Sequence, residues 1–265
     1  MKLAVNYSRE METLHLNGEV NFDLYKCPDW DDLITSASRN KPIYVHFPLT
    51  VGDGSIQSVD WIRIDKLLRE TNTPFINLHL SAPPDLNPGD PIQVSQALQS
   101  AISDIQMVVK RYGQDVVILE ELPVLSEGTE FLYHVAQPGI IKQVIQEGGC
   151  NLLLDIAHVR LTAINLGLDL YAYLNQLPLD RLREFHVTGI GPQPSDGILV
   201  DHLELSPEDW QITEWCFQRI DAGDWQKPEL VSFEYGGIGE IFHWRTESRV
   251  MLEQVPRLYS LVHPN

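Results

Sequence analysis

Short, nearly continuous apolar runs recur along the whole chain. Eight of them predict β-strands, at residues 3–7, 22–27, 42–47, 74–80, 115–122, 151–158, 184–189 and 230–237. Runs of this kind, without apolar–polar alternation, are typical of parallel strands whose two faces are both covered. The pattern therefore favours a parallel sheet that is buried on both sides.

The segments between most of these runs carry apolar residues at spacings of three and four, which is typical of helices. We predict helices at residues 61–70, 92–112, 131–147, 170–177, 207–220 and 245–262. Ser206 and Pro207 suit the N-cap and first turn of one helix, and Thr246 is a candidate cap for the last. Gly139 marks a point where the third could break, and residues 8–21 are too short and polar to predict as a helix.

Eight strands that mostly alternate with helices in 265 residues predict an α/β fold, a single (β/α)8 TIM barrel. The alternative is a doubly wound open sheet, which would be supported by a glycine-rich turn after the first strand. No such turn follows Tyr7, and no linker or internal repeat divides the chain. We therefore expect one domain over residues 1–265.

Composition narrows the possible partners and the compartment. The chain has 37 acidic and 19 basic residues, a net charge of −18, which disfavours nucleic acid as a partner because phosphate backbones are repelled. No apolar stretch is long enough to predict a membrane span. The three cysteines, Cys27, Cys150 and Cys216, are far apart, and the N-terminus becomes charged too early for a signal peptide. We expect a cytoplasmic protein.

Histidines and carboxylates recur at the ends of the predicted strands. From the third strand to the eighth these residues are His46, His79, Glu120 with Glu121, Asp155 with His158 three residues later, His186 and Glu234. The carboxyl ends of barrel strands meet at one mouth, where active sites of this fold lie. The sequence therefore predicts that these side chains converge.

Each of these residues alone has an ordinary interpretation, as a core histidine or a helix cap. Together, four acids and several histidines with few basic neighbours are hard to pair internally, and buried charge is costly unless it is paired or bound to metal. Histidine with carboxylate and no cysteine suits Mn, Zn, Co or Fe, and we predict one to three such ions. HEXXH, Walker, GXGXXG and GXSXG motifs are absent, and His15, His134 and His263 are predicted surface residues.

These residues, with the strings LLLDIAHV, HVTG and EYGG, resemble the xylose-isomerase-like TIM barrel superfamily over roughly residues 3–262. That superfamily includes sugar isomerases and epimerases, type IV apurinic endonucleases and multinuclear non-haem iron oxidative enzymes. The resemblance implies a shared metal set of Glu120, Asp155, His186 and Glu234. The strings look more like the iron oxidative family than the endonucleases.

The likeness to the multinuclear members implies further ligands. His46 and His79 would hold a second metal with Glu120 bridging, and His158 would bind an additional one. A third site would use Asp201 and His202, which are adjacent here, whereas those members carry one residue between the two. Glu121 stands where that family often has asparagine.

Three functions stay open. The first is a metal-dependent isomerase or epimerase of a small, sugar-like hydroxy-carbonyl compound, with Glu120 and Glu234 as catalytic acid and base. The second is a multinuclear non-haem iron oxidative enzyme acting on a peptide, and the third is a non-catalytic barrel with a residual metal site. Candidate substrate-binding residues are Lys26, Glu121, Arg160 and Gly236. The net charge disfavours an apurinic endonuclease.

Because of the charge of −18 and the lack of any Lys/Arg stripe, we expect no useful binding to DNA at physiological salt. A fluorescence-anisotropy titration of duplex DNA checks this. Micromolar affinity for the duplex, or cleavage of abasic DNA, would contradict the prediction.

Overall fold

The computed structural model describes residues 1–240, 242 and 244–264. Its main sheet is parallel and has the strand order β3-β2-β1-β11-β8-β7-β6-β5-β4. The strands are β1 (Lys2–Asn6), β2 (Leu24–Cys27), β3 (Ile43–Val45), β4 (Thr50–Val51), β5 (Ile76–Leu80), β6 (Val117–Glu121), β7 (Asn151–Asp155), β8 (Leu182–Val187) and β11 (Leu230–Phe233). A separate antiparallel hairpin pairs β9 (Gly189–Pro192) with β10 (Leu199–Leu203).

The two edge strands of this order, β3 and β4, follow each other directly in the chain, so the sheet curls into a barrel. β3 pairs with β2, and β4 pairs with β5. Between them the backbone N–H of His46 still donates to the carbonyl of Cys27 at 2.8 Å. The side chain of Asn77 then takes over, accepting from Phe47 N at 2.7 Å and donating to Phe47 O at 2.8 Å. The (β/α)8 prediction is confirmed, with the third barrel strand split in two.

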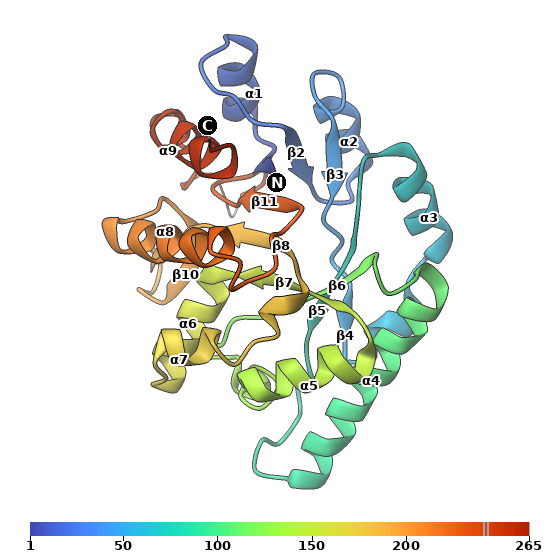
Figure 1. The fold of residues 1–265 in the computed structure, drawn as a ribbon. Coiled ribbons are helices and arrows are strands. Elements are labelled where there is room, and N and C mark those ends of the chain that lie inside the picture. Colours follow the sequence, from blue (N-terminus) through green and yellow to red (C-terminus); the bar gives the residue numbers. More distant parts are fainter. Residues whose placement is uncertain (241, 243, 265) are drawn as a thin grey trace.

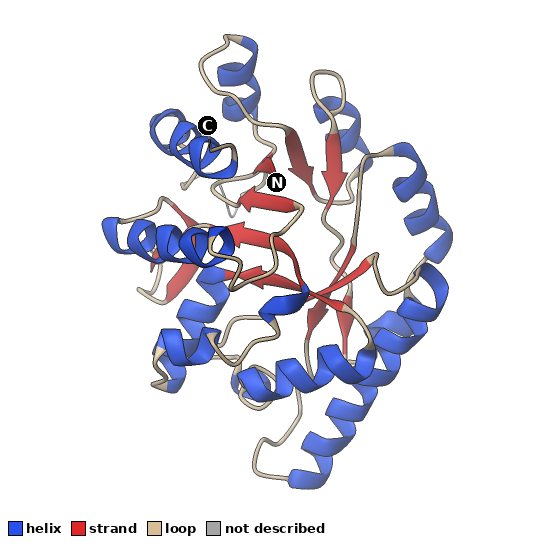
Figure 2. Ribbon diagram, in the orientation of Figure 1, coloured by secondary structure: helices blue, strands red, loops and turns tan. Residues whose placement is uncertain are grey.

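Helices lie around the outside of the strands (Figures 1 and 2). They are α1 (Arg9–Leu16), α2 (Asp31–Ala37), α3 (Trp61–Glu70), α4 (Pro91–Tyr112), α5 (Pro138–Gly148), α6 (Ile156–Leu166), α7 (Leu170–Leu174), α8 (Pro207–Asp221) and α9 (Ser248–Val262), with 3₁₀ turns at Ser55–Ser58, Glu130–Leu132 and Leu179–Arg181. No helix in the described part of the chain has the length and apolar character needed to cross a membrane.

Three helices were not predicted, and each has a local cause. Helix α1 begins at a cap in which Ser8 Oγ accepts from Met11 N at 3.0 Å, and it buries only Met11 and Leu14. Helix α2 is a seven-residue segment with two buried residues. Helix α6 begins inside the strand predicted at residues 151–158, because Asp155 ends β7 and caps the helix. The amphipathic patterns of α1 and α2 are too short to be recognised from hydrophobic periodicity. The first turns of α6 are buried throughout and therefore show no periodicity.

Two predicted helix starts were too early. The helix predicted at 131–147 begins at Pro138, whose fixed φ suits the first turn, so the interruption lies before Gly139. The helix predicted from residue 245 begins at Ser248, and Thr246 does not cap it because its hydroxyl donates to the carbonyl of Phe242 at 2.8 Å. The predicted cap of α8 is confirmed, since Ser206 Oγ accepts from Asp209 N at 3.2 Å.

The barrel interior has an apolar floor and a polar mouth. Along each strand, side chains that face the helices alternate with side chains that face the barrel interior. The inward-facing ones form two small apolar clusters, Ala4 with Leu24, Tyr44 and Leu230, and Phe75 with Ile118 and Leu153. Two residues further along a strand the same face turns polar, as Leu24 is followed by Lys26, Ile118 by Glu120 and Leu153 by Asp155. The strand period therefore stacks the candidate site directly on an apolar layer.

The β9–β10 hairpin depends on a close backbone approach at Gly189. A Cβ atom there would lie 2.0 Å from the carbonyl oxygen of Glu204. We expect Gly189→Ala to lower the free energy of unfolding by about 1–3 kcal/mol, because the strands must separate to admit the methyl group. Urea denaturation measures the change.

The matched control is Gly139→Ala in α5, where a Cβ meets nothing within 4 Å. It should be neutral or raise the free energy of unfolding by up to about 1 kcal/mol. Equal stability of the Gly189→Ala variant and the parent would contradict the close approach.

Candidate metal centre

The predicted strand-end residues come together at the barrel mouth as linked groups of possible metal ligands. Among the described residues, four sets have all their ligand atoms within 4.8 Å of one another: His46, His79 and Glu120; His46, Glu184 and His186; Glu120, Asp155 and His158; and Asp155, His186 and Glu234. Shared members join the sets into one centre. The strand register helps to bring these side chains together, because His79 pairs with Glu120 on the neighbouring strand and Asp155 pairs with His186.

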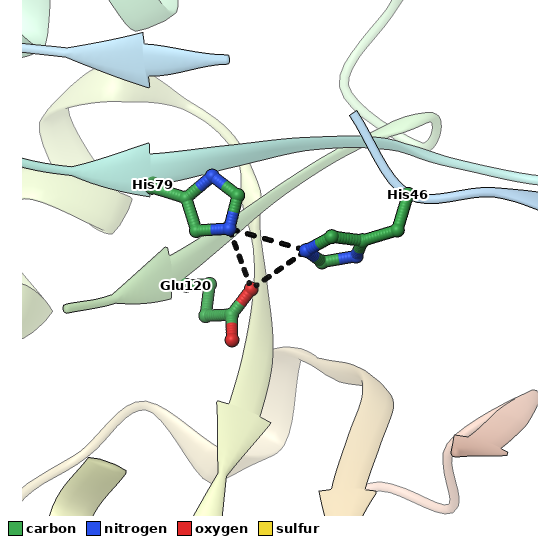
Figure 3. Close-up of side chains that lie close together, drawn as sticks. All are labelled: His46, His79 and Glu120. Carbon is green, nitrogen blue, oxygen red and sulfur yellow. Dashed lines mark hydrogen bonds and ion pairs between the residues drawn. The ribbon is translucent and has the colours of Figure 1, made fainter. Parts of the chain in front are cut away.

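Glu120 lies between two of these groups. Its Oε2 is 3.4 Å from His46 Nε2 and 3.2 Å from His79 Nε2, and the three side chains point toward one another (Figure 3). Its Oε1 faces the other way, 3.4 Å from His158 Nδ1 and 3.5 Å from His186 Nδ1. Oε2 thus faces the His46–His79 pair and Oε1 faces His186, which is the arrangement that a bridging ligand needs. The His158 nitrogen near Oε1 donates to the carbonyl of Glu121 and offers no lone pair on that side.

The two carboxylate oxygens of Asp155 have different environments, one at a helix N-terminus and one in the mouth. Its Oδ1 accepts from Ala157 N at 2.7 Å and from His158 N at 3.1 Å, which caps α6. Its Oδ2 is buried and lies 3.8 Å from His186 Nδ1, and that same nitrogen is 3.0 Å from Glu234 Oε1. The cap therefore fixes the carboxylate so that its second oxygen points into the mouth.

Three histidines of the mouth are held from behind by backbone carbonyl groups. Nδ1 of His79 lies 3.1 Å from Leu49 O, Nδ1 of His158 lies 2.8 Å from Glu121 O, and Nδ1 of His202 lies 2.6 Å from Glu234 O. A carbonyl oxygen can only accept, so each of these Nδ1 atoms is the donor and each Nε2 is directed toward the mouth. Metal-binding histidines are characteristically oriented in this way.

His186 is oriented in the opposite sense by a buried carboxylate. Its Nε2 donates to Glu184 Oε1 at 2.8 Å, and the same oxygen accepts from Tyr44 OH at 2.8 Å. Nδ1 therefore faces the carboxylates of the mouth. Sequence analysis missed Glu184 and Tyr44. Glu184 lies two residues before His186 on the same strand, so strand alternation places both on one face and could have identified it.

The adjacent pair Asp201–His202 reaches the mouth through a bulge in β10. The register with β9 shifts there, and His202 has φ of +59°, the left-handed region. In a regular strand the two side chains would point to opposite faces. Here Asp201 Oδ2 lies 3.0 Å from His158 Nε2, and His202 Nε2 lies 3.8 Å from Asp201 Oδ2 and 3.9 Å from Glu234 Oε2. The bulge brings the pair to one side despite the missing spacer residue.

The electrostatics of the mouth favour a cation. Burial alone would raise the pKa of Glu120, but His186 and His79 outweigh it and hold that pKa well below the usual range. Burial and Lys26 act to lower the pKa of His186, yet Glu120 and Asp155 raise it to about 9. Burial holds the pKa of Lys26 below its ordinary value. Carboxylates here outnumber the fixed cations.

Unpaired buried atoms also fit a metal. Glu120 Oε2, Asp155 Oδ2 and His186 Nδ1 are buried and have no contact with hydrogen-bond geometry; their near neighbours are other possible ligand atoms, such as Glu234 Oε1 at 3.0 Å from His186 Nδ1. Buried polar atoms in proteins are nearly always hydrogen-bonded. Oxygen and imidazole lone pairs that face one another without partners are the donor set that Mn, Fe, Co or Zn binds.

The four candidate substrate-binding residues lie in different environments. The ammonium group of Lys26 contacts Glu234, within the mouth. Gly236 has φ of +68° and its carbonyl accepts from Asn6 Nδ2 at 3.0 Å, so it turns the chain beside the mouth.

The two other candidates do not join the ligand groups. Glu121 alternates with Glu120 and points to the opposite face of β6, where burial raises its pKa well above the usual range. Arg160 is buried where α6 meets α8, and it forms ion pairs with Asp209 and Glu208 of α8. It is therefore not part of the proposed site. His15, His134 and His263 lie outside the ligand groups formed by the described residues and are partly buried.

Comparison with solved structures places the fold. D-psicose 3-epimerase in the presence of D-fructose has a TM-score of 0.57 and 12% identity, with 98% of each chain covered. The IOLI protein with a bound zinc atom has a TM-score of 0.55 and 13% identity, with 99% of this chain and 98% of that chain covered. An AP endonuclease from Brucella melitensis has a TM-score of 0.55 and 14% identity over 96% and 98%. These likenesses show the xylose-isomerase-like TIM barrel fold and nothing finer.

Sequence comparison is more specific. A UPF0276 protein of Acinetobacter baylyi is 26% identical over 211 residues, which are 77% of this chain and 70% of that protein. One of Paraburkholderia phytofirmans is 39% identical over 91 residues, 32% of this chain and 30% of the relative. The profile of a family described as RiPP precursor modification enzyme MbnB/TglH/ChrH matches residues 29–224, which contain every predicted metal ligand except Glu234. The chain belongs to the MbnB/TglH/ChrH family of RiPP precursor modification enzymes.

Proposed function

We propose that this protein is a multinuclear metal enzyme that oxidatively modifies a peptide precursor. Sequence analysis put an isomerase or epimerase first and this function second. The family match supports the second, because the family is described by modification of RiPP precursors, that is, of ribosomally made peptides. The epimerase neighbours share the fold at 10–14% identity and carry no argument for the reaction.

The single observation that carries the proposal is the position of Glu120 between two sets of histidines. One metal would need only Glu120, Asp155, His186 and Glu234. His46 and His79 add a second set on the other oxygen of Glu120. His158, Asp201 and His202 would hold a third ion. A sugar epimerase acting by acid–base chemistry at a single metal has no use for these extra ligands.

Bound metal ions would supply redox chemistry and polarise a substrate donor atom. The chain's own residues prepare the site. Glu184 and the backbone carbonyls fix the imidazole rings, so that their free nitrogens meet without reorganisation. Lys26, buried against Glu234, offers the mouth a positive charge that could orient a carbonyl or carboxylate of the peptide.

We expect protein purified without added metal to contain about two or three iron ions per chain, measured by inductively coupled plasma mass spectrometry. Glu120→Gln keeps the size of the side chain but removes the bridging charge, so it should lose most of this metal and retain the fold, since the core lies elsewhere. The matched control is Glu127→Gln, an exposed glutamate after the same strand. A single zinc or manganese ion per chain, or full iron content in Glu120→Gln, would refute the multinuclear proposal.

Glu184 should act through His186. We expect Glu184→Gln to weaken metal binding about 10–100-fold, because the amide orients the ring less strongly than the carboxylate and lowers its basicity. Chelator competition measures the affinity, and the optical spectrum of the cobalt-substituted protein reports the ligand field. Glu229→Gln, at an exposed site that pairs with Arg183, is the control. Lower thermal stability with unchanged metal affinity and spectrum would show that Glu184 is only structural.

A further inference from the structure

A cavity of about 430 Å³ lies directly beside the candidate metal centre. It is lined on one side by Lys26, His46 and His202, which belong to the mouth described above. Its volume falls within the roughly 300–1,000 Å³ of ligand-binding pockets in proteins. The cavity therefore adjoins the candidate ligands and shares His46 and His202 with them.

The other wall of this cavity is apolar. It is formed by side chains from the β2–α2 connection, from helix α2 and from the segment after β11, with Tyr7 at the end of β1; the main contributors are Tyr7, Cys27, Trp30, Leu33, Ile238 and Phe242. Tyr7, Cys27 and Leu33 also pack into the hydrophobic core, so this wall is rigid. Lys26 and Glu240 are the charged residues among the described residues that line the cavity, and a charged side chain placed against the apolar residues would lose hydration there.

Trp30 has no evident local structural role. It occupies the N-cap position of α2, where serine, threonine, aspartate or asparagine is preferred, and its side chain makes no capping hydrogen bond. It leaves 52% of its surface exposed. A large aromatic residue that is half exposed at the edge of an apolar cavity is well suited to contact a ligand.

Two glycines shape the opposite edge. Gly236 and Gly237 have φ of +68° and +157°. A Cβ atom at Gly237 would lie 2.9 Å from Phe242 Cδ2. The bare backbone therefore lets the Phe242 ring lie against the chain, 5.3 Å from the ring of His202. This contact connects the apolar wall to a candidate ligand.

We propose that this cavity binds an apolar or aromatic side chain of the peptide substrate, next to the residue that is modified, and that Trp30 sets this specificity. The inference rests on the proposed peptide-modifying function. The position beside the candidate ligands argues for the substrate itself as occupant, and the apolar wall argues for the class of side chain.

Capped amino acids test the cavity without knowledge of the whole peptide. In saturation-transfer NMR with the metal-containing protein as purified, N-acetyl-phenylalaninamide and N-acetyl-leucinamide should bind more tightly than N-acetyl-lysinamide and N-acetyl-aspartamide. Trp30→Ala should weaken binding of the phenylalanine probe roughly three- to tenfold, while Trp30→Phe should retain most of it. Tyr171→Ala, at a half-exposed aromatic on α7, should have no effect. Metal content should stay unchanged in all three variants, because none alters a candidate ligand.

Equal binding of charged and apolar probes, or equal losses in Trp30→Ala and Tyr171→Ala, would overturn the cavity proposal whatever the metal content. Selective binding of apolar probes to a protein that holds a single metal ion would instead support the cavity and refute the multinuclear function. The two failures are therefore distinguishable.

Discussion

Buried charge at the barrel mouth is the constraint on which the rest of this structure depends. Glu120, Asp155 and Glu234 are all at most 3% exposed, and Lys26 is the buried lysine beside them. Desolvating carboxylates is costly, and close like charges raise the cost further. The histidines respond to this field in opposite ways, since the pKa of His186 is raised to about 9 while burial holds that of His46 well below the ordinary value. Divalent cations bound among these groups would relieve the imbalance that one lysine cannot.

The fold supplies stability away from the site. Apolar residues fill the layer between sheet and helices, and the two small clusters close the floor of the barrel. The candidate metal ligands occupy one layer above that floor, two residues later on the same strands. Asp155 shows how closely the two demands can be combined, because one oxygen caps α6 and the other is left for the site. A carboxylate at a strand end is therefore not forced to be either a helix cap or a ligand.

Much of this arrangement could be predicted from the sequence because it follows two periodicities. Buried parallel strands give continuous apolar runs, and a polar residue at the end of such a run lies at the barrel mouth. This rule identified His79, Glu120 and Glu234. Features that depend on tertiary contacts could not be found in this way. The third strand splits because the side chain of Asn77 replaces part of its ladder. The environment of Arg160 is set by α8, almost 50 residues further along.

The hairpin shows most clearly why local pattern is insufficient. Adjacent Asp201 and His202 contradict strand alternation if both are to face one centre, and the sequence gives no sign that His202 adopts a left-handed conformation. The bulge resolves the contradiction by changing backbone geometry, and the carbonyl of Glu234 then fixes the ring of His202. A motif that lacks one residue can thus preserve the positions of its side chains. The adjacent pair can take the place of the spaced Asp and His if its lone pairs point to the same position. The spacing of residues along the chain is only one way to direct those lone pairs.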